Sequence, residues 1–362
     1  MRLRRRLLTD SAPEDYMPIP VVRTHATFEP DVTRVIAKLF MPGAAASDEG
    51  RARIERIISS VLAMSSTQVA VTLATTMARF TLRHRDLAAL LDRHFTAVAH
   101  HVPAQRCSPE QRRLIGAYFT HEYAVDAAAL TNPSMVAAPD QAGVGPDACR
   151  FVMSLRGIGE GHISSIHFRA GVVDASHRLA LEVPSPYTTN GLRRSGLYDK
   201  QAFRGKLGEL RLFNEVAAGI LDALPERFTM TQLEGALAGR GDTQATRTIH
   251  WLAASNYEVE FSVTSLSECV LFPGGPTESH GMEDARFVRF RYDDGSVTYF
   301  APYTAYDGYT ILPSSSRRRT SPPSGSPRSP VARWPTRESR SFHARSTDAL
   351  RPSRAWMPRT TT

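Results

Sequence analysis

Apolar side chains in the first third of the chain recur every three or four residues, which is the spacing of one helix face. The pattern is clearest in residues 51–64 and 84–98. Its positions are Ile54, Ile57, Ile58 and Leu62, then Leu87, Leu90, Leu91, Phe95 and Val98. We therefore predict a helical domain and linker over residues 28–150. An irregular arm at residues 1–27 precedes it, because its prolines exclude a long helix.

The stretch Ser108-Pro109-Glu110-Gln111 has the features of a helix start. Serine caps free N–H groups, proline suits the first helical position, and glutamine three residues after the serine closes a capping box. Two interpretations of these helices are open: a partner-binding or regulatory module, and a domain that packs against the rest of the chain. The second is the simpler.

Alternation of apolar with polar or small residues begins near residue 163 and predicts strands. The apolar positions are Ile166, Phe168, Ala170 and Val172, and much later Tyr257, Val259, Phe261 and Val263. Between these regions an apolar stripe from Leu207 to Leu224 returns to helical spacing. We therefore predict a helical insertion at about residues 201–254, and a linker rich in proline and glycine at residues 131–150.

A hairpin is predicted after the second strand region. Asp293-Asp294-Gly295-Ser296 separates two strand-like runs, residues 287–292 and 297–303, and Asp-Gly is a strong hairpin-turn signal. Short antiparallel strands joined by tight turns are typical of sandwiches and propeller blades. The predicted fold class is therefore α+β, with its strands in residues 151–312.

The composition changes at about Pro313. Residues 313–362 are rich in Ser, Arg and Pro, contain few aliphatic residues and show no periodicity. Such a segment cannot bury enough apolar surface to offset its ordering entropy. We predict a disordered tail; an RNA-binding Arg/Ser tail and a translation artefact are the alternatives.

The tail also accounts for the basic character of the chain. The net charge is +8, and residues 314–362 contribute eleven arginines against two acids. Removing that +9 leaves −1 for residues 1–313, so the body of the chain is nearly neutral. A charge that resides in the tail is weak support for a nucleic-acid partner.

Other compositional features narrow the class of protein. The three cysteines form no CxxC pair, so neither a zinc site nor a disulfide framework is supported. The apolar content of 42% suffices for a core, yet no apolar run has the length of a signal peptide or a membrane span. We expect a cytoplasmic protein with no membrane partner.

The residues best suited to catalysis or ligand binding lie at 281–287. Glu283 and Asp284 are adjacent, so in a strand their side chains would point to opposite faces and would not act together on one bond. Arg286 would share a face with Asp284. Pairing would lower the pKa of that carboxyl, unless the guanidinium contacts substrate or phosphate instead. A surface ion pair is the simple alternative.

Aromatic and acidic groups follow one strand later, at Tyr303, Tyr306 and Asp307. Such a mixture suits a sugar ring, which has apolar faces and polar edges. A metal site is not predicted, because His162 and His167 have neither helical i, i+4 spacing nor an HExxH pattern. A serine hydrolase is not predicted either, because no GxSxG elbow is present.

Three stretches resemble glycoside hydrolase family 130: GHISSIHFRAG at residues 161–171, ESHGMEDARF at residues 278–287 and YTAYDG at residues 303–308. That family contains β-mannoside phosphorylases and β-mannosidases built on a five-bladed β-propeller. The resemblance covers roughly residues 151–312, and the preceding helices resemble the N-terminal extension of a longer-chain branch.

The resemblance implies roles for individual residues. Asp284 matches the family's catalytic acid, which protonates the glycosidic oxygen, in phosphorylases through a sugar hydroxyl. Arg286, in the same motif, would help shape the site. Ser164 and Ser165 fall where the family has a polar pair that touches the sugar. The other sugar contacts it suggests are Arg169, Glu283, Tyr303 and Asp307.

The implied substrate is a β-mannoside or manno-oligosaccharide, with no cofactor apart from inorganic phosphate as a co-substrate. An inverting reaction needs an acid on one side of the sugar and phosphate or an activated water on the other. In this family the phosphate-binding residues, or the base of the hydrolases, come from later blades. The choice between phosphorolysis and hydrolysis is therefore open.

This sequence departs from the family pattern after Pro313. The family continues for several more blades, whereas this chain changes to Arg/Ser/Pro-rich sequence, as a reading-frame shift in a high-GC gene would produce. We therefore expect an incomplete propeller, C-terminally truncated, in an enzyme compromised by the truncation. The alternative, from another class, is a non-catalytic interaction protein with a basic, nucleic-acid-binding tail.

Overall fold

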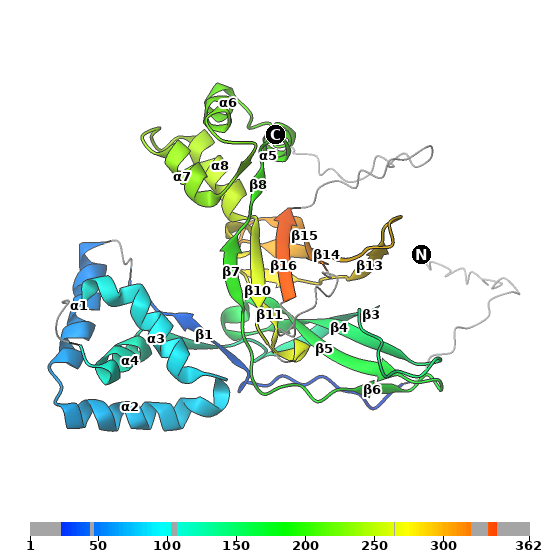
Figure 1. The fold of residues 1–362 in the computed structure, drawn as a ribbon, viewed down its shortest axis with the longest axis horizontal. Helices are drawn as coiled ribbons and strands as arrows, with labels where there is room; N and C mark the ends of the chain where they lie inside the picture. The colour runs from blue at the N-terminus through cyan, green and yellow to red at the C-terminus, as the bar shows by residue number, and fades with distance from the viewer. Residues whose placement is uncertain (1–22, 44–46, 103–106, 264, 320–331, 339–362) are drawn as a thin grey trace, which may run out of the picture.

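The structure, a computed structural model, describes residues 23–43, 47–102, 107–263, 265–319 and 332–338. These residues form eight α-helices and three sheets, arranged as two helical units beside one large sheet (Figure 1). None of the sheets is closed. The predicted mixture of helices and strands is thus confirmed, while the five-bladed propeller stays a prediction. Most of the predicted arm lies outside the described residues.

The N-terminal helical unit contains α1 (Asp48–Leu62), α2 (Ser66–Phe80), α3 (Leu87–Val98) and α4 (Pro109–Tyr118). The predicted capping box at the start of α4 is confirmed: Ser108 Oγ accepts from the N–H of Gln111 at 3.2 Å, and Gln111 Oε1 accepts from the N–H of Ser108 at 3.0 Å. The apolar faces meet in one core, formed by Ile54, Ile58, Val61, Val69, Val98, Leu114, Ile115 and Phe119. Helical periodicity therefore identified much of the buried face correctly.

The crossing of α3 and α4 depends on a glycine. A Cβ added at Gly116 would lie 2.0 Å from the carbonyl oxygen of Leu91, which belongs to the backbone and cannot turn aside. We expect Gly116→Ala to lower the free energy of unfolding by about 1–3 kcal/mol, measured by urea denaturation, because the helices must separate. Gly205→Ala in α5 (Lys200–Glu209) is the matched control, because its Cβ would meet nothing within 4 Å. There alanine should stabilise by up to about 1 kcal/mol; similar effects of the two substitutions would contradict this account.

The helical domain and linker predicted over residues 28–150 also contains two strands, one on each side of its four helices. β1 (Val35–Leu39) and β2 (Thr120–Ala124) form a two-stranded antiparallel sheet, with Val35 opposite Ala124 and Leu39 opposite Thr120. The four helices lie between these strands in sequence. Each strand is only five residues long, and its partner is distant in the chain, so periodicity alone does not reveal the pair.

The main sheet contains twelve strands. Along its length the order is β3-β4-β5-β12-β14-β15-β16-β10-β7, and β6, β11 and β13 pair with single members of this series. The bounds are β3 Ala129–Ala137, β4 Cys149–Ile158, β5 Ser164–Val173, β6 Leu179–Leu181, β7 Leu192–Ser195, β10 Tyr257–Phe261, β11 Val270–Leu271, β12 Gly281–Glu283, β13 Val288–Arg291, β14 Val297–Tyr306, β15 Ile311–Arg319 and β16 Ala332–Glu338. One face covers a core that includes Ile166, Phe168, Phe261, Met282, Ala301 and Ala305.

Several predicted strands are confirmed, and one predicted linker is not. β5 and β10 occupy the two alternating stretches, and Arg291 pairs with Val297 across the predicted Asp-Gly hairpin. The linker predicted at residues 131–150 is wrong in its first part, because β3 pairs with β4 up to Ala137 opposite Phe151. Pro133 stands at an irregularity between Thr131 and Ser134, where the register shifts. A proline in a strand is tolerated at such a place.

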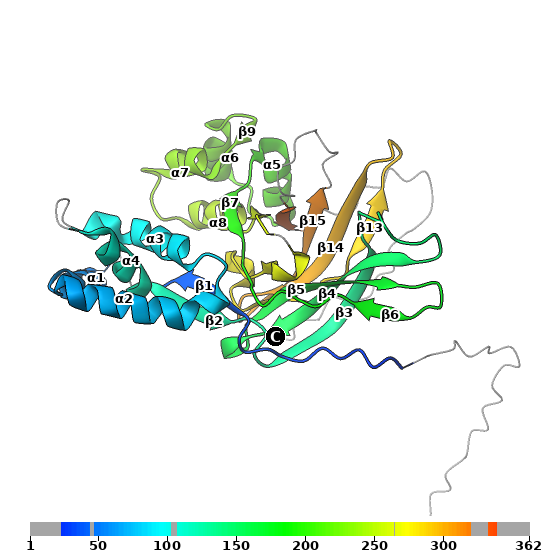
Figure 2. The ribbon, with the colours of Figure 1, turned by 60° about the horizontal axis from the view of Figure 1, so that its bottom comes forward.

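The predicted helical insertion corresponds to a second unit with its own core. It contains α5 (Lys200–Glu209), α6 (Glu215–Asp222), α7 (Met230–Leu237) and α8 (Gln244–Ala254), together with a small sheet of β8 (Tyr198–Asp199) and β9 (Arg227–Phe228). Its core includes Leu207, Ile220, Leu221, Phe228, Leu233, Ile249 and Leu252. The two helical units lie apart from each other in Figure 1, and the β13–β14 hairpin lies on the far side of the sheet from α1–α4 (Figure 2).

The disorder predicted for residues 313–362 is wrong for the parts that form β15 and β16. β15 pairs with β14 from Ile311 opposite Tyr306 to Arg319 opposite Thr298, and β16 joins β15 to β10. Backbone N–H and C=O groups along a strand edge need partners whatever the side chains of the incoming strand are. The compositional rule concerns side-chain burial, so it does not reveal this pairing. Residues 320–331 and 339–362 lie outside the described residues.

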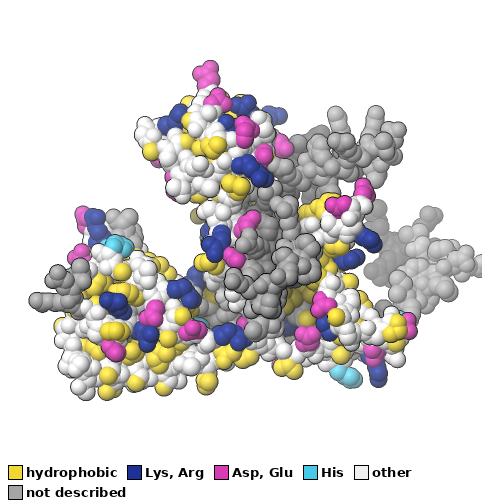
Figure 3. Space-filling model, viewed as in Figure 1, with side chains coloured by type: hydrophobic (Ala, Val, Ile, Leu, Met, Phe, Trp, Pro, Cys, Tyr) yellow, Lys and Arg dark blue, Asp and Glu magenta, His cyan; other side chains and the backbone are white. Residues whose placement is uncertain are grey.

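Two further features are the length and hydropathy of the helices and the distribution of charge on the surface. Within the described residues no single helix is long and apolar enough to cross a membrane, although α1 and the helix that follows it, bent by 110°, reach that length and composition together. On the face in Figure 3, basic and acidic side chains are interspersed over the parts that are coloured. The coloured parts of that face therefore present no large area of one sign.

Candidate functional site

The candidate site lies at the end of β12, a short strand in the middle of the main sheet. β12 runs parallel to β5, where Gly281 pairs with Ser164, and antiparallel to β14, where Glu283 pairs with Thr304. Met282 points into the core. Asp284 then takes a left-handed conformation with φ of 54°, which ends the strand. Aspartate is one of the few residues besides glycine that adopt this conformation readily.

Two carboxylates and one guanidinium meet at this point. Arg156, on β4, approaches Glu283 Oε1 with Nη2 at 2.6 Å and Asp284 Oδ1 with Nη1 at 3.8 Å. Its Nε donates to Ser164 Oγ at 3.0 Å, and that hydroxyl lies 3.4 Å from Glu283 Oε1. Asn132 completes the group, because its amide Nδ2 donates to Asp284 Oδ1. We call these five residues the Arg156 cluster.

The prediction that Glu283 and Asp284 act on opposite faces is therefore wrong. The left-handed turn at Asp284 breaks the two-residue alternation, so both carboxylates face Arg156. Arg286 does not pair with Asp284 among the described contacts. Its Nη1 donates instead to the carbonyl oxygens of Asn132 and Pro133, at 3.1 and 3.0 Å. Arg286 thus holds the bulge in β3 that presents Asn132 to Asp284.

The Arg156 cluster is partly exposed to solvent. The side chains of Arg156 and Glu283 are each 23% exposed, and that of Asp284 is 39% exposed. Two carboxyl groups thus share one guanidinium, and Asp284 has one oxygen free of the contacts described above. Carboxylates accept from hydroxyl groups, whereas guanidinium and amide groups donate to hydroxyl oxygens. Such a set fits the alternating donors and acceptors at the edge of a sugar.

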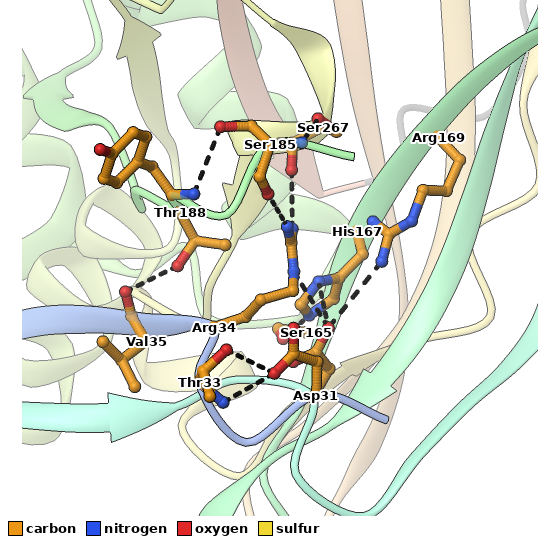
Figure 4. A network of polar contacts seen from close by, with 12 residues as sticks. Asp31, Thr33, Arg34, Val35, Ser165, His167, Arg169, Ser185, Thr188 and Ser267 are labelled. Atoms are coloured by element: carbon orange, nitrogen blue, oxygen red, sulfur yellow. Dashed lines mark hydrogen bonds and ion pairs between the residues drawn. The ribbon is translucent and has the colours of Figure 1, made fainter. Parts of the chain in front are cut away.

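Ser165 and Arg169 lie on the other face of β5 from Ser164. Ser165 Oγ is 2.9 Å from His167 Nε2, and Arg169 Nη2 lies 3.9 Å from Asp126. Figure 4 shows both side chains in a polar network with Arg34. Ser165 is fully buried and Arg169 is 6% exposed. The structure therefore separates these two predicted sugar contacts from the Arg156 cluster.

Tyr303 forms its hydrogen bond with a different group of residues from the Arg156 cluster. Its hydroxyl donates to Glu278 Oε2 at 2.8 Å, and Tyr257 donates to the other oxygen of the same carboxylate. The N–H groups of Gly274 and Gly275 donate to Glu278 Oε1, each at 3.0 Å. Burial, and then the charge of Glu278, raise the pKa of Tyr303 well above its ordinary value. This group holds the Pro273–Pro276 turn against the sheet.

Asp307 stands in the turn after β14. Its Oδ1 accepts from the N–H groups of Thr310, at 2.6 Å, and Tyr309, at 2.9 Å. These two hydrogen bonds lower the pKa of the Asp307 carboxyl. The side chain therefore closes its own turn, in the manner typical of aspartate in loops. His280 lies near enough for its charge to act on Asp307, and its ring lies 6.0 Å from that of Tyr306.

Two members of the cluster, Arg156 and Asn132, were not among the predicted site residues. Arg156 interrupts the apolar run Phe151–Ile158, and a charged residue within a buried strand is a signal that could have been read. Asn132 has a positive φ of 51°, which asparagine tolerates. Only the pairing of β3 with β4 shows that it reaches Asp284.

No group of three or more His, Cys, Asp and Glu side chains that could hold a metal ion occurs in the described part of the chain. Comparison of the whole chain with protein-family models, with curated proteins and with solved structures finds no match. The function must therefore be inferred from the chemistry of the Arg156 cluster and from the motifs in the sequence.

Proposed function

We propose that this chain binds β-mannosides at the Arg156 cluster and cleaves them by inverting phosphorolysis or hydrolysis, with Asp284 as the acid. The observation that carries the proposal is the convergence of Glu283 and Asp284 on Arg156 at a partly exposed strand end. The three motif stretches that resemble the mannoside-processing family include Glu283, Asp284 and Ser164.

In this proposal the residues have distinct tasks. Arg156 and Asn132 orient the two carboxylates and donate to sugar hydroxyls. Glu283 accepts from a sugar hydroxyl, which fixes the ring. Asp284 delivers the proton to the glycosidic oxygen, through a sugar hydroxyl when phosphate is the acceptor. Inversion then requires phosphate or water to attack from the opposite side of the ring. Positioned proton transfer of this kind accelerates a reaction by about 10²–10⁴-fold.

The proposal is tested with a panel of β-manno-oligosaccharides, incubated with and without inorganic phosphate. The product distinguishes the two acceptors: inversion gives α-mannose 1-phosphate with phosphate and free α-mannose with water, both seen by NMR. Binding is followed in parallel by calorimetry. The proposal fails if no β-mannoside binds or reacts while unfolding experiments show a folded protein.

Arg156→Gln probes the guanidinium in the same assays. We expect it to weaken sugar binding about 10- to 100-fold, because hydrogen bonds to charged groups contribute about 1.5–3 kcal/mol. Arg178→Gln is the matched control, because Arg178 forms an exposed ion pair with Asp174 within a surface loop. Equal affinities of the two variants would place sugar binding elsewhere.

A further inference from the structure

A second polar cluster joins the N-terminal helical unit to the main sheet. Arg34 immediately precedes β1 and Asp126 closely follows β2, so both belong to the two-stranded sheet that carries the helices. His167 and Arg169 project from β5. All four side chains are buried: Asp126 and His167 are 0% exposed, Arg34 is 3% and Arg169 is 6%. We call them the Asp126 cluster.

Its contacts tie the two parts of the chain together. Arg34 Nε lies 3.2 Å from Asp126 Oδ2, and its terminal nitrogens donate to the carbonyl oxygens of Ser267, at 2.8 Å, and Ser185. Thr188 Oγ1 donates to the carbonyl oxygen of Val35 at 2.7 Å. Figure 4 shows Arg34 reaching from the β1 side to Ser185 and Ser267. Separation of β1 and β2 from β5 would break all of these contacts.

Asp126 and His167 face each other at a distance too long for a direct hydrogen bond. His167 Nδ1 and Asp126 Oδ2 are 3.9 Å apart, and the same Asp126 oxygen lies 3.2 Å from Arg34 Nε. The other charged groups nearby are Asp31 beside Arg34, Arg169 on β5, and Glu268, which forms an ion pair with Arg85. The proton on this pair is therefore governed mainly by burial.

Burial acts on the two groups in opposite directions, because it disfavours the charged form of each. It raises the pKa of Asp126 to about 6, against the opposing effect of Arg34 and Arg169. Burial, together with the charges of Arg34 and Arg169, lowers the pKa of His167 to about 3, against the opposing effect of a backbone hydrogen bond with Val125. In the closed state β1 and β2 pack against β5, and on acidification Asp126 takes the proton. In the open state the two parts have separated and water reaches both groups, so His167 takes the proton first.

We propose that Asp126 and His167 form an acid-compensated latch, which keeps the N-terminal unit attached to β5 with nearly constant strength between pH 6 and pH 4.

The compensation follows from counting the protons bound in the closed and in the open state. For Asp126 alone, the closed state binds a proton below about pH 6 and the open state only below its ordinary pKa of 3.8, so acid favours closure. For His167 alone, the open state binds a proton below 6.5 and the closed state only below about 3, so acid favours opening. Together the two states bind equal numbers of protons in this window.

Single substitutions in the full chain expose the two opposing responses. In Asp126→Asn the opening constant should rise about tenfold for each pH unit lowered from 6 to 4.5, because only His167 responds. In His167→Gln it should fall about tenfold per unit over the same range. The opening constant is measured by hydrogen exchange of the β1 and β2 amides, corrected for the intrinsic effect of pH. Slopes of the same sign in both variants would overturn the latch.

The unaltered protein provides a test that does not depend on the folding of either variant. After the same correction, the protection of the β1 and β2 amides should be constant within about threefold between pH 6 and pH 4.5. NMR should show the ring of His167 neutral throughout this range. A tenfold loss of protection per pH unit, or a protonated ring at pH 5, would contradict the proposal. Neither measurement depends on whether the Arg156 cluster binds a sugar.

Discussion

Asp284→Asn is expected to abolish the turnover of β-mannosides while leaving the fold intact. Asparagine has nearly the same shape as aspartate but has no proton to deliver, so the loss should be about 10²–10⁴-fold in kcat/KM. Asparagine also tolerates the left-handed conformation, with φ of 54°, that residue 284 adopts. The urea midpoint should therefore change little. The measurement is the rate of product formation with and without phosphate, together with sugar affinity by calorimetry.

Asp294→Asn is the matched control for this experiment. Asp294 lies in the β13–β14 hairpin turn, where its Oδ1 accepts from the N–H of Ser296 at 2.8 Å, a hydrogen bond that asparagine can also accept. Its activity should equal that of the unaltered protein. If Asp284→Asn keeps full activity, another residue must be the acid. If it loses activity and affinity equally, Asp284 binds the sugar without acting as the acid.

Arg34→Met is expected to cause the largest loss of stability among the substitutions considered. Arg34 and Asp126 form a buried ion pair, and methionine would leave the carboxylate without its closest cation. Breaking a buried pair by removal of one partner costs about 3–5 kcal/mol, because an uncompensated charge stays in the interior. Loss of the hydrogen bonds to Ser185 and Ser267 acts in the same direction. Urea unfolding monitored by circular dichroism measures the change.

Arg53→Met tests whether burial is the cause. Arg53 pairs with Glu49 at 2.8 Å on the surface of α1, where both side chains are well exposed. Its removal should change the free energy of unfolding by less than about 1 kcal/mol. The double variant Arg34→Met/Asp126→Asn should recover part of the loss, because it removes the unpaired charge. A loss at Arg34 no larger than that at Arg53 would contradict the role given to the Asp126 cluster.

Local patterns were sufficient for much of the secondary structure. The recurrence of apolar residues every three or four positions located α1 and α3, and the Ser108 capping box located the start of α4. Alternation located β5 and β10, and Asp-Gly located the hairpin. Each of these signals lies within a few residues of the structure it predicts. β1 and β2 were missed because each pairs with a strand that is distant in the chain. β15 pairs with its neighbour β14, but its residues lack the composition and alternation of a strand.

The motif at residues 281–287 was singled out from the sequence, yet its geometry was predicted incorrectly. Strand alternation assigned Glu283 and Asp284 to opposite faces, and the positive φ at Asp284 brought them together. Alternation did hold along β5. It places Ser164 with the Arg156 cluster and Ser165 with the buried network, so two adjacent serines have different environments.

The sequence by itself determined the helical units, the alternating strands and the segment in which the acidic residues lie, because helix caps, periodicity and turn residues act over short distances. Only the tertiary structure decided which charges meet. Arg156 and Asn132 reach Asp284 through the pairing of β3 with β4 and of β5 with β12, and Arg34 reaches Asp126 through β1 and β2. Hydrogen bonds and ion pairs require positions within a few ångströms, and those positions are set by strand pairing between distant parts of the chain.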